Sequence, residues 1–548
     1  MAKYIFVTGG VVSGLGKGIT AASLGKLLRL RGYKVSVQKI DPYLNVDPGT
    51  MSPYEHGEVF VTDDGAETDL DIGHYERFLD INCSRKSGIT SGQIYSSILT
   101  KERRGDYLGH TVQIVPHVTN EIKDYMRSIG EGQDIVIIEI GGTVGDLEQA
   151  VYIEAIRQFR HELGSGNSVS IHVTLIPYIA SSGEIKTKPT QNSVKDLQQQ
   201  GVFADVLVCR TTADVELDQE HRDKIAMFCS LDHPEDVIHN RDCRTIYEVP
   251  LMFAKQNFDT IVLKKLNLKL NKCDLTAWRQ MVEKLCDDSL PEVTVAIVGK
   301  YVAVADAYIS VTEALKHAGI TNNVRVKVKL VDAENIERDG AAVWLKDVQG
   351  VIVPGGFGNR GIEGKIATIQ YLRENNIPFL GICLGMQTSV IEFARHVCDL
   401  KNANSTEINE KTKYPVIHLI DEQKDIHTKG GTMRLGLYDC QIKAGTLAEK
   451  LYGKTAIKER HRHRYEFNND YRKQLESAGL VVSGVNPQAN LVEIVELPNH
   501  PYFIACQFHP ELISRPQHPH PLFQGLVAAA VKKMPRQSEF ENLWFGKK

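Results

Sequence analysis

The sequence predicts an α/β protein built from two doubly wound domains, and three observations support this prediction. Apolar segments rich in β-branched residues alternate with helical segments, beginning at Lys3–Thr8. The alternation stops and then restarts at Val293–Gly299. Each series carries a glycine-bordered turn directly after an apolar strand. Strands that are apolar on both faces and separated by helices are typical of parallel sheets covered by helices on two sides.

The first series contains a leading helix and five predicted strands. The helix covers Ile19–Arg31, and Gly32 is the glycine expected just after its last turn. The strands are Lys3–Thr8, Lys34–Ile40, Asp134–Ile140, Val169–Ile176 and Val206–Cys209.

A polar stretch near residues 268–292 separates the two series, and Pro291 precedes the new first strand. We therefore predict a first domain over 1–267, a linker over 268–292 and a second domain over 293–548. The later elements of the second domain are a helix at Ala307–Ala318, strands at Val324–Val331, Val348–Pro354 and Pro378–Cys383, and a helix at Met386–Ala394.

Composition limits the class of protein. A chain of 548 residues is too long for one core. Its 42% apolar and 24% charged residues are ordinary for a globular protein. The net charge is −4 and the sequence has no polybasic stretch, so we expect no nucleic-acid partner. No apolar run approaches the ~20 residues that cross a bilayer, and the ten cysteines form no CxxC pair. These features predict a cytoplasmic protein with no membrane partner.

The first glycine-rich turn, Gly9–Gly18, leaves a strand and enters a helix. Backbone N–H groups in such a turn, backed by a helix N-terminus, favour an anion, and Lys17 would reach the terminal phosphates of a nucleotide. The usual phosphate-loop pattern needs glycine at position 11 and Ser or Thr at position 18, but this chain has Val11 and Gly18. A plain strand–turn–helix junction is the alternative for this motif taken alone.

Two carboxylates favour the nucleotide interpretation. Glu139 ends an apolar strand, and Asp71 closes an acidic stretch that starts at Asp63 and Asp64. A carboxylate at the carboxyl end of a parallel strand faces the crevice where ligands bind. Mg²⁺ binds through one or two carboxylates plus substrate phosphates, so Asp71 and Glu139 are candidate ligands. We interpret Asp63 and Asp64 as solvated loop acids.

A second cationic motif, Lys186–Gln191, follows a strand and precedes a helix. Two ammonium groups and several hydrogen-bond donors suit a triphosphate. Exposed loop lysines are usually only solvated, and that alternative stays open for this motif by itself.

The second glycine-bordered turn carries a possible nucleophile, Cys383. A sharp strand-to-helix turn exposes such a residue, offers the next backbone N–H to a developing oxyanion, and favours thiolate through the helix dipole. His509 is the predicted base and Glu511 its orienting carboxylate. Pro354–Gly358 closes a neighbouring strand and could add main-chain donors. Together these groups predict acyl transfer from an amide.

Other cysteines and histidines have simpler interpretations. Cys209, Cys398 and Cys506 suit small buried hydrophobes. His461 and His463 sit in the basic run Glu459–Arg464, which we interpret as a binding or solvated surface with no catalytic role.

At this point the residues resemble the CTP synthase family, from Tyr4 to about Leu526. The matching segments are Gly9–Gly18, Lys39–Tyr43, Asn45–Pro53, His56–Val61, Gly65–Leu70, Lys101–Gly109, Gly141–Asp146, Lys186–Gln191 and Glu459–Glu466. The second half is similar to class I glutamine amidotransferases, whose marks are the glycine-flanked cysteine and the His-Pro-Glu at 509–511.

The resemblance implies a P-loop amidoligase domain, similar to dethiobiotin synthetase, followed by a class I glutamine amidotransferase domain. Glutamine would be hydrolysed through a Cys383 thioester, with His509 as base and Glu511 as orienter. Ammonia would pass internally to the first domain, where ATP and Mg²⁺ phosphorylate O4 of UTP and ammonia displaces the phosphate to give CTP. Members of this family are activated by GTP, inhibited by CTP and form homotetramers.

The resemblance also implies binding residues. Those expected at ATP are Gly14, Leu15, Gly16, Lys17, Gly18, Ile19, Lys39, Asp71, Arg241, Asp242 and Cys243, the last three departing from the family in residue type. Those expected at UTP or CTP are Ser13, Asp146, Leu147, Glu148, Lys186, Thr187, Lys188, Pro189, Thr190, Gln191 and Lys224. Those expected at glutamine are Gly356, Leu384, Gly385, Met386, Gln387, Glu407 and Arg464. Asp71 and Glu139 are expected at Mg²⁺, and Gly430–Gly436 matches a GTP-responsive lid preceded by the poorly matched stretch Glu422–Lys429.

Two other functions stay open from the sequence. One is a different glutamine-dependent amidoligase of the same lineage, acting for example on a cofactor carboxylate. The other is a P-loop partitioning ATPase or filament protein with a vestigial cysteine domain. His56, in a glycine-bordered loop, could line an ammonia tunnel or be an ordinary structural histidine.

Overall fold

The computed structural model describes residues 2–212, 215–419 and 431–534. The chain divides into two compact units. The first unit contains Met1–Pro48 and Thr68–Cys286, and the second contains Gly49–Glu67 and Asp287–Lys548. The lid segment predicted at 430–436 begins in the gap at 420–430, and the stretch Glu422–Lys429 lies wholly outside the described residues.

The first unit is built on a seven-stranded sheet in which every neighbouring pair is parallel. Its order is β11-β10-β7-β1-β6-β2-β5. The strands are β1 (Lys3–Gly9), β2 (Val35–Asp41), β5 (Gly88–Thr90), β6 (Ile135–Ile140), β7 (Ser168–Leu175), β10 (Val206–Thr211) and β11 (Val237–Arg241). This arrangement confirms the predicted parallel sheet, and its register places Val7 and Lys39 on either side of Glu139.

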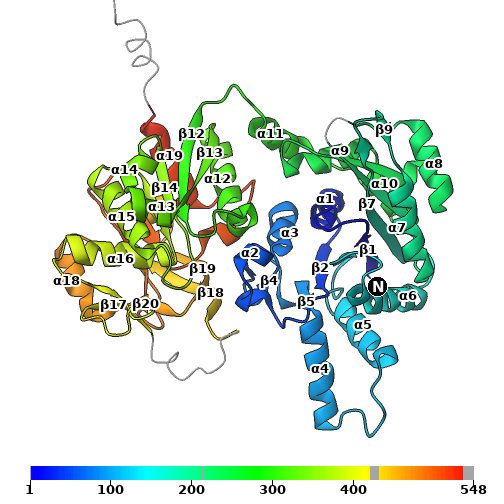
Figure 1. The fold of residues 1–548 in the computed structure, drawn as a ribbon, viewed down its shortest axis with the longest axis horizontal. Helices are drawn as coiled ribbons and strands as arrows, with labels where there is room; N and C mark the ends of the chain where they lie inside the picture. The colour runs from blue at the N-terminus through cyan, green and yellow to red at the C-terminus, as the bar shows by residue number, and fades with distance from the viewer. Residues whose placement is uncertain (1, 213–214, 420–430, 535–548) are drawn as a thin grey trace, which may run out of the picture. The chain divides into compact units, whose positions relative to one another are not determined.

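Helices cover both faces of this sheet (Figure 1). One face carries α1 (Lys17–Leu30), α3 (Asp71–Leu79), α9 (Val249–Lys255) and α10 (Phe258–Lys265). The other carries α5 (Thr119–Ser128), α6 (Ala150–Leu163), α7 (Lys188–Gln199) and α8 (Gln219–Cys229). The doubly wound prediction therefore holds for the first unit.

The segment predicted as a linker contains a packed helix of the first unit, α11 (Thr276–Leu285). Trp278 of this helix is buried, its ring centroid lies 5.8 Å from that of Tyr247, and its indole N–H donates to Tyr247 O at 2.9 Å. Lys26 of α1 lies 4.6 Å over the indole ring. The domain boundaries at 267 and 293 stay a prediction, and the packing places residues 276–285 with the first unit.

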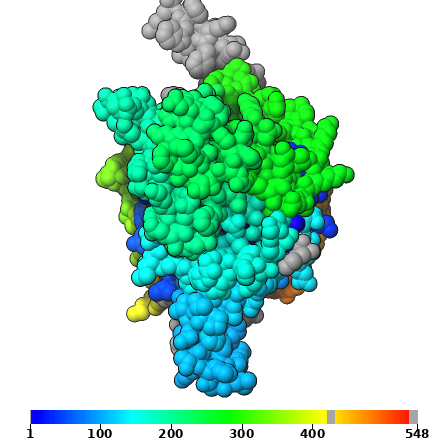
Figure 2. All heavy atoms as spheres, turned by 90° about the vertical axis from the view of Figure 1, so that its right-hand side faces the viewer, coloured from blue at the N-terminus to red at the C-terminus, as the bar shows by residue number. Residues whose placement is uncertain are grey.

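One helix of the first unit projects beyond its neighbours. Figure 2 shows α4 (Ser91–Arg104) and the loop after it as a blue column extending from this unit, as Figure 1 also shows. Leu99 and Leu108 on this projection are exposed.

The second unit contains a nine-stranded mixed sheet of order β13-β12-β14-β15-β23-β22-β21-β18-β19. The pairs from β13 to β23 are parallel and those from β23 to β19 are antiparallel. The strands are β12 (Glu292–Gly299), β13 (Arg325–Asp332), β14 (Gly350–Val353), β15 (Phe379–Ile382), β18 (Arg434–Ile442), β19 (Ala456–His463), β21 (Val481–Val485), β22 (Val492–Glu496) and β23 (Phe503–Cys506). A smaller sheet holds β16 (Asn404–Ser405), β17 (Pro415–Leu419) and β20 (Tyr465–Phe467).

Alternate residues of β12 enter two different cores of the second unit. Val295 and Ile297 pack with α12 (Ile309–Asn322) and α19 (Pro521–Lys532). Ala296 and Val298 pack on the opposite side. The helices on that side include α13 (Ala333–Asp339), α14 (Ala341–Leu345), α15 (Ile362–Glu374) and α16 (Leu384–His396). Because side chains alternate along a strand, a strand covered on both sides reads as continuously apolar.

Short helices complete the second unit: α2 (Pro53–His56), α17 (Leu447–Tyr452) and α18 (Arg472–Ser477). Within residues 2–212, 215–419 and 431–534, no helix combines the length and apolarity required to span a bilayer. All ten cysteines lie in these ranges, and each is a free thiol.

Candidate active sites

The turn between β15 and α16 holds Cys383 in a conformation that few residues other than glycine adopt, with φ 53° and ψ −104°. Gly381 and Gly385, on either side of this turn, have to be glycine because neighbouring atoms leave no room for a side chain at either position. A Cβ on Gly385 would lie 2.0 Å from Val353 O, and one on Gly381 would lie 2.8 Å from the Cβ of Ala505. Close packing therefore fixes a backbone strain of about 1–3 kcal/mol at the nucleophile.

His509 and Glu511 lie beside this cysteine. The Nδ1–H of His509 donates to Glu511 Oε1 at 2.7 Å. A Cβ on Gly355 would be 2.9 Å from Cε1 of His509 and 3.6 Å from the Cβ of Cys383, so both side chains flank the same glycine. The Nε2 atom of His509 is buried and makes no ordinary hydrogen bond within the described chain.

Electrostatics favour an imidazolium at this position. Burial alone would lower the pKa of His509, but Glu511 and Cys383 outweigh it and raise the pKa to about 10. Gln507 Nε2 donates to Sγ of Cys383 at 3.7 Å, and the same sulfur lies 3.7 Å from Arg462 O. A protonated histidine and an amide N–H that donates to sulfur therefore both lie at Cys383, as expected around a nucleophilic cysteine.

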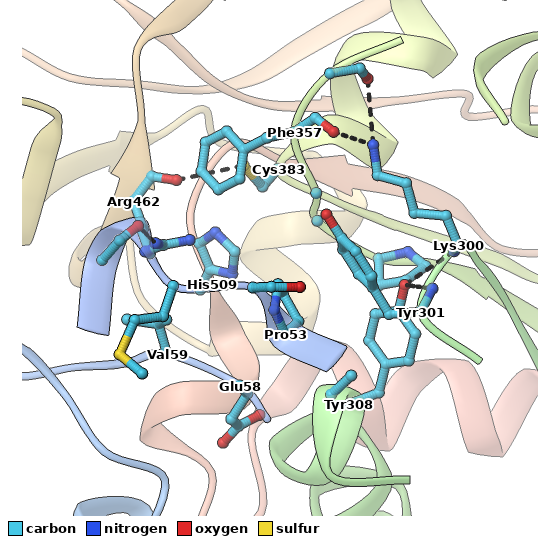
Figure 3. A pocket seen from close by; sticks show the side chains of 18 of the residues that line it. Pro53, Glu58, Val59, Lys300, Tyr301, Tyr308, Phe357, Cys383, Arg462 and His509 are labelled. Carbon is cyan, nitrogen blue, oxygen red and sulfur yellow. Dashed lines mark hydrogen bonds between the residues drawn. The ribbon is translucent and has the colours of Figure 1, made fainter. Parts of the chain in front are cut away.

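A cavity of about 670 Å³ opens over these residues. Figure 3 shows Cys383, His509, Phe357 and Lys300 around it. Its size suits a small polar molecule, and catalytic groups converge at one wall.

The loop after β14 presents main-chain donors at this cavity. Neither the Gly355 nor the Gly356 N–H donates a hydrogen bond in the described structure. Two lysines hold the carbonyl side of the loop: Lys365 Nζ donates to Pro354 O at 3.2 Å, and Lys300 Nζ donates to Phe357 O and, at 3.2 Å, to Gly358 O. Since C=O and N–H point in opposite directions across a trans peptide, this pull on Pro354 O turns the N–H of Gly355 away from Lys365.

These lysines were not singled out from the sequence, and both have unusual titration. Burial, and then repulsion by Lys300, lower the pKa of Lys365 to about 7, while Cys383 opposes them. Burial lowers the pKa of Lys300 to about 8. A lysine within a helix and another after a strand carry no local pattern that distinguishes them from surface lysines.

The residues predicted at glutamine fall into two groups. Gly356 and Arg464 line the cavity, and Glu407 accepts from the Gly358 N–H at 2.9 Å. At the start of α16, Met386 packs into the core, while the Gln387 amide donates to Tyr465 O at 3.0 Å. Leu384 and Gly385 are buried in the same turn, so any contact they make with a ligand would come from backbone atoms.

One wall of the cavity comes from residues 49–59, which the sequence places in the first domain and the structure places in the second unit. Tyr54 OH donates to Lys300 O at 2.6 Å, and Glu58 accepts from the Ser310 N–H at 2.9 Å. Arg462 binds Glu67 at 2.8 Å and the carbonyl of Gly49 at 3.0 Å. The sequence offers no signal for this docking, because each contact joins residues more than 200 positions apart.

The interpretation of His461 and His463 as surface residues is wrong, and that of Asp63 and Asp64 as solvated loop acids holds for Asp64, which is exposed. His461 and His463 are buried, because β19 is covered on the face to which both point. Asp63 is not simply solvated: it forms an ion pair with the buried guanidinium of Arg460 at 2.6 Å. A strand of successive basic residues is typical of a surface. Here, however, each face of β19 has its own carboxylate partners.

In the first unit, the turn after β1 has the geometry of a phosphate loop. Gly14 and Gly16 adopt φ 72° and 79°, and Gly16 is the N-cap of α1. Lys17 Nζ donates to Gly142 O at 2.7 Å. Val11, where the usual pattern has glycine, also adopts a positive φ of 82°.

The second departure, Gly18, has a direct cause. A Cβ at Gly18 would lie 2.0 Å from Oδ1 of Asp71. The carboxylate of Asp71 therefore occupies the space in which the usual Ser or Thr side chain would lie, and that hydroxyl is the group that normally binds Mg²⁺ in a phosphate loop. The space of the usual hydroxyl is thus filled by a carboxylate oxygen of Asp71.

Asp71 belongs to a buried charge cluster around Lys39. The Lys39 ammonium pairs with Asp71 and lies 3.4 Å from Glu139, 3.7 Å from Asp69 and 3.9 Å from Asp41. Burial alone would raise the pKa of Asp71, but Lys39 outweighs it and the pKa is lowered. Burial raises the pKa of Glu139, against the effect of Lys39.

This cluster suits a divalent cation. Four carboxylates surround Lys39, so negative charge exceeds the positive charge that this lysine supplies. Asp71 and Glu139 have the hard oxygen donors that Mg²⁺ prefers, and Tyr75 OH donates to the second oxygen of Glu139. Asp71 and Glu139 therefore suit Mg²⁺ as two of its ligands, with substrate phosphates needed for the rest, because the described residues hold no group of three or more His, Cys, Asp or Glu side chains placed for a metal.

The residues predicted at UTP or CTP line different cavities. Lys186, Thr187, Lys188, Gln191 and Lys224 line one of about 1210 Å³. Leu147 and Glu148 line another, of about 510 Å³, and Asp146 is exposed beside them. Pro189 and Thr190 begin α7, where Thr190 is buried and donates to Leu175 O, and Ser13 is exposed in the phosphate loop.

Arg210 links the phosphate loop to the segment predicted near adenine. Its guanidinium donates to Leu15 O at 3.2 Å and to Asp242 at 2.7 Å. Arg241 ends β11 and Cys243 follows, so Arg241–Cys243 lies at the carboxyl ends of the parallel strands, as the phosphate loop after β1 does. Ile19 lies in the first turn of α1.

Comparison with known proteins agrees with this geometry. The family described as CTP synthase N-terminus matches residues 3–268, and the family described as class-I glutamine amidotransferase matches residues 303–529. The chain is 56% identical to the CTP synthase of Staphylococcus aureus over 97% of its own length and 99% of the relative's. It is 58% identical to the CTP synthase of Caldanaerobacter subterraneus over 97% and 98% of the two chains.

The chain belongs to the CTP synthase family. CTP synthases are glutamine-hydrolysing ligases that make CTP from UTP with the use of ATP, and this is the activity of the chain. The solved glutaminase domain of the Trypanosoma brucei enzyme, with bound acivicin, is 40% identical over 44% of this chain and 95% of that domain, with a TM-score of 0.42. Membership of the CTP synthase family excludes the partitioning ATPase and the other amidoligase considered from the sequence.

Proposed function

We propose that the second unit hydrolyses glutamine through a thioester on Cys383. The thiolate attacks the amide carbon, and His509, held by Glu511, gives its proton to the departing ammonia. Water then attacks the thioester carbon, with His509 accepting a proton, and glutamate leaves. The hydrogen bond from His509 to Glu511 and the raised pKa of His509 support this assignment.

We propose the Gly355 and Gly356 N–H groups, with the first N–H of α16, as donors to the oxyanion of the tetrahedral intermediates. Donors fixed before reaction stabilise developing charge without rearrangement, and removal of one typically costs about 10²–10³ in kcat. We propose that Gly356, Glu407 and Arg464 bind glutamine itself, Arg464 by its guanidinium and Glu407 by its carboxylate; Gly356 and Arg464 line the cavity, and Glu407 accepts from the loop at Gly358, which supports this assignment.

For the first unit we propose that the phosphate loop, with Lys17 and Lys39, binds ATP, and that Lys186–Gln191 and Lys224 bind UTP. Phosphorylation of uracil O4 converts a poor leaving group into phosphate, which ammonia then displaces from C4. Asp71 and Glu139 would hold Mg²⁺, which when bound neutralises phosphate charge. The surplus of carboxylates around Lys39 supports this role.

We also propose the regulatory properties of the family for this chain: activation by GTP, inhibition by CTP with Asp146–Glu148 among its contacts, and a homotetramer. Exposed apolar residues support an association surface in the first unit. Leu147 is 88% exposed beside the 510 Å³ cavity, and Leu99 and Leu108 are exposed on the α4 projection. Measuring mass in solution by light scattering tests the tetramer, and a monomer at every nucleotide concentration would contradict it.

The observation that carries the proposal is the strained Cys383 beside the His509–Glu511 pair. Cys383→Ala should abolish CTP formation from glutamine, by at least about 10³-fold, because the nucleophile is lost. Formation of CTP from ammonium salts should stay within about twofold of the unmodified protein, since that reaction needs only the first unit. Absorbance of the CTP product measures both, and parallel loss of both activities would contradict two separable sites.

A further inference from the structure

Behind the catalytic pair lies a cluster of five buried ionisable side chains, none of which the proposed chemistry uses. They come from four strands of the second unit: Arg434, His461, His463, Glu466 and Glu493. Arg434 bridges the two carboxylates, with contacts of 3.2 Å to Glu466 and 2.7 Å to Glu493. All five side chains are at least nine-tenths removed from solvent, so their charges must balance among themselves.

The histidines form a directed chain. His463 Nδ1 lies 3.2 Å from Tyr465 O, and since a carbonyl only accepts, Nδ1 carries a proton. His461 Nδ1 and His463 Nε2 are 2.9 Å apart, a distance that requires one proton between two nitrogens. At the far end, His461 Nε2 faces Glu493 Oε2 at 3.5 Å.

A proton count follows from these three contacts, because the Nδ1–H of His463 that also faces Glu466 Oε1 at 3.5 Å is the proton already counted at Tyr465 O. Two neutral imidazoles supply two protons, which the first two contacts use. The third contact would then join two lone pairs, and neither His461 Nε2 nor Glu493 Oε2 has another hydrogen-bond partner among the described residues. Buried acceptors facing each other cost free energy unless a proton lies between them. One further proton also makes the cluster neutral, because Arg434 alone offsets only one of two carboxylates.

The cluster is joined to the catalytic pair through backbone. Arg460 O accepts from the His509 N–H at 2.8 Å, and Arg462 O lies 3.7 Å from Sγ of Cys383, so the carbonyls of β19 contact both residues. The Gln507 N–H donates to Glu493 O at 2.9 Å, while the Gln507 side chain donates to Cys383. Both β19 and β22 therefore carry a cluster residue next to a backbone group that positions the reaction centre.

We propose that Arg434, His461, His463, Glu466 and Glu493 form a buried positioning network that holds one proton between His461 and Glu493 and fixes the backbone that orients Cys383 and His509. The raised pKa values of both carboxyls agree with one proton held by this pair of acids at neutral pH, and the contact with His461 assigns that proton to Glu493. Burial, opposed by Arg434, raises the pKa of Glu493 to about 7 and that of Glu466 to about 8. Burial, Arg434 and His509 lower the pKa of both histidines.

Few other polar groups face the network. The Tyr438 ring lies 4.4 Å from the Arg434 guanidinium, and the Phe508 ring packs 5.9 Å from that of His461. Cys440 of β18 is a titratable group close to Glu493 and Arg434, and burial raises its pKa above its usual range. The imidazolium of His509 disfavours a positive network, which agrees with a neutral one.

The test compares Glu493→Gln with Glu493→Ala in the full chain. The amide of Gln donates to His461 and accepts from Arg434, as a protonated carboxyl does. We expect Glu493→Gln to keep glutaminase kcat at neutral pH within about threefold, and Glu493→Ala to lose at least about tenfold in kcat with KM within about twofold, because positioning of the reacting groups is lost and glutamine contacts are kept. We expect the alkaline limb of kcat to move upward by at least about half a pH unit in Glu493→Gln, because an amide cannot lose the network proton.

Glu496→Gln is the matched control, since Glu496 lies on the same strand, is buried and accepts from Leu447 and Ala448 away from the network. It should leave the pH profile of kcat in place. The proposal is overturned if Glu493→Gln fails to fold, loses as much activity as Glu493→Ala, or keeps the alkaline limb of the unmodified protein. It is also overturned if Glu496→Gln shifts that limb equally.

The kinetic readout rests on the proposed thioester chemistry, so a second measurement is independent of it. Because the folded-state pKa of Glu493 is raised from its usual 4.5 to about 7, its contribution to stability is complete below about pH 4.5 and is lost as pH rises to about 7. The melting temperature of Glu493→Gln should therefore fall less than that of Glu496→Gln between these values. An equal fall in both variants would contradict a proton held between His461 and Glu493, even if Cys383→Ala behaved as proposed.

Discussion

The two strand-to-helix turns of this chain use glycine for opposite purposes. In the first unit, Gly14 at the tip of the turn has nothing within 4 Å of the position a Cβ would take, whereas Gly10 and Gly18 near its two ends are packed against Ser193 and Asp71. In the second unit, Gly381 and Gly385 have backbone or side-chain atoms within 3 Å of that position. The first turn leaves room for an anion, and the second is packed so tightly that it holds Cys383 in a strained conformation.

This contrast teaches that a glycine-rich motif does not by itself indicate a flexible loop. An open turn with positive φ values presents N–H groups to a phosphate, because the ligand supplies the missing contacts. A packed turn presents one side chain, because neighbouring atoms supply the contacts already. We therefore expect alanine substitutions in the two turns to impair different properties of the protein.

The largest effect is expected for Gly385→Ala. The new methyl would meet Val353 O at 2.0 Å, so the turn must move and Cys383 must leave its position. We expect glutaminase activity to fall at least about 100-fold and the free energy of unfolding to fall by about 3 kcal/mol. Ammonia production and chemical denaturation measure the two effects.

Gly445→Ala is the control for that variant, since Gly445 has a positive φ of 81° but open space around it. It should cost only about 1 kcal/mol and leave glutaminase activity unchanged. Gly385 has no positive φ, so equal effects at both positions would contradict packing against Val353 as the cause of the loss.

Gly18→Ala should have the next largest effect, in the first unit. Its methyl would meet Asp71 at 2.0 Å and displace a proposed Mg²⁺ ligand. We expect CTP formation from ammonium salts to fall by about tenfold to 100-fold, with glutaminase activity in the absence of nucleotides unchanged. Loss of glutaminase activity alone would contradict the separation of the two turns.

Titration of the packed site should follow His509. Because its pKa is raised from the usual 6.5 to about 10, the stability that its charged form contributes is complete below about pH 6.5 and is lost as pH rises to about 10. The melting temperature should fall across that window, and Glu511→Gln should flatten the fall because the charge that stabilises the imidazolium is gone. If the melting temperature of Glu511→Gln fell as steeply with pH as that of the unmodified protein, the His509–Glu511 pair would not be the cause of the fall.

The smallest effect on stability is expected for Gly14→Ala in the open turn. Its φ of 72° costs the folded state about 1 kcal/mol with alanine, and no atom is displaced. KM for ATP should rise by less than about tenfold, while kcat from glutamine at saturating ATP stays within about twofold. A loss of stability as large as that expected for Gly385→Ala would contradict the difference in packing between the two turns.

Local motifs explain how much could be predicted from the sequence. The parallel α/β architecture followed from strands that are apolar on both faces, and Cys383, His509 and Glu511 from short motifs at the ends of such strands. The departures at Val11 and Gly18 were visible, but their cause was not, because Asp71 lies more than 50 residues from Gly18.

The parts that the sequence misrepresents depend on long-range register. In β19, Arg460 and Arg462 point to Asp63 and Glu67, whereas His461 and His463 point to Glu493 and Glu466. A run of alternating basic residues has the same local pattern whether its partners are water or buried carboxylates. The acidic partners themselves, most of them distant in sequence, distinguish the two.

The passage of residues 49–67 into the second unit has a practical consequence for dissecting the enzyme. A fragment that starts at residue 287 would lack Asp63 and Glu67, and with them the acidic partners of two arginines next to the reaction centre. It would also lack the wall of the cavity that Gly49–Tyr54 provide. A faithful glutaminase module therefore has to be assembled from two separate stretches of the gene product, for example by fusing the short stretch to the long one through a designed connector.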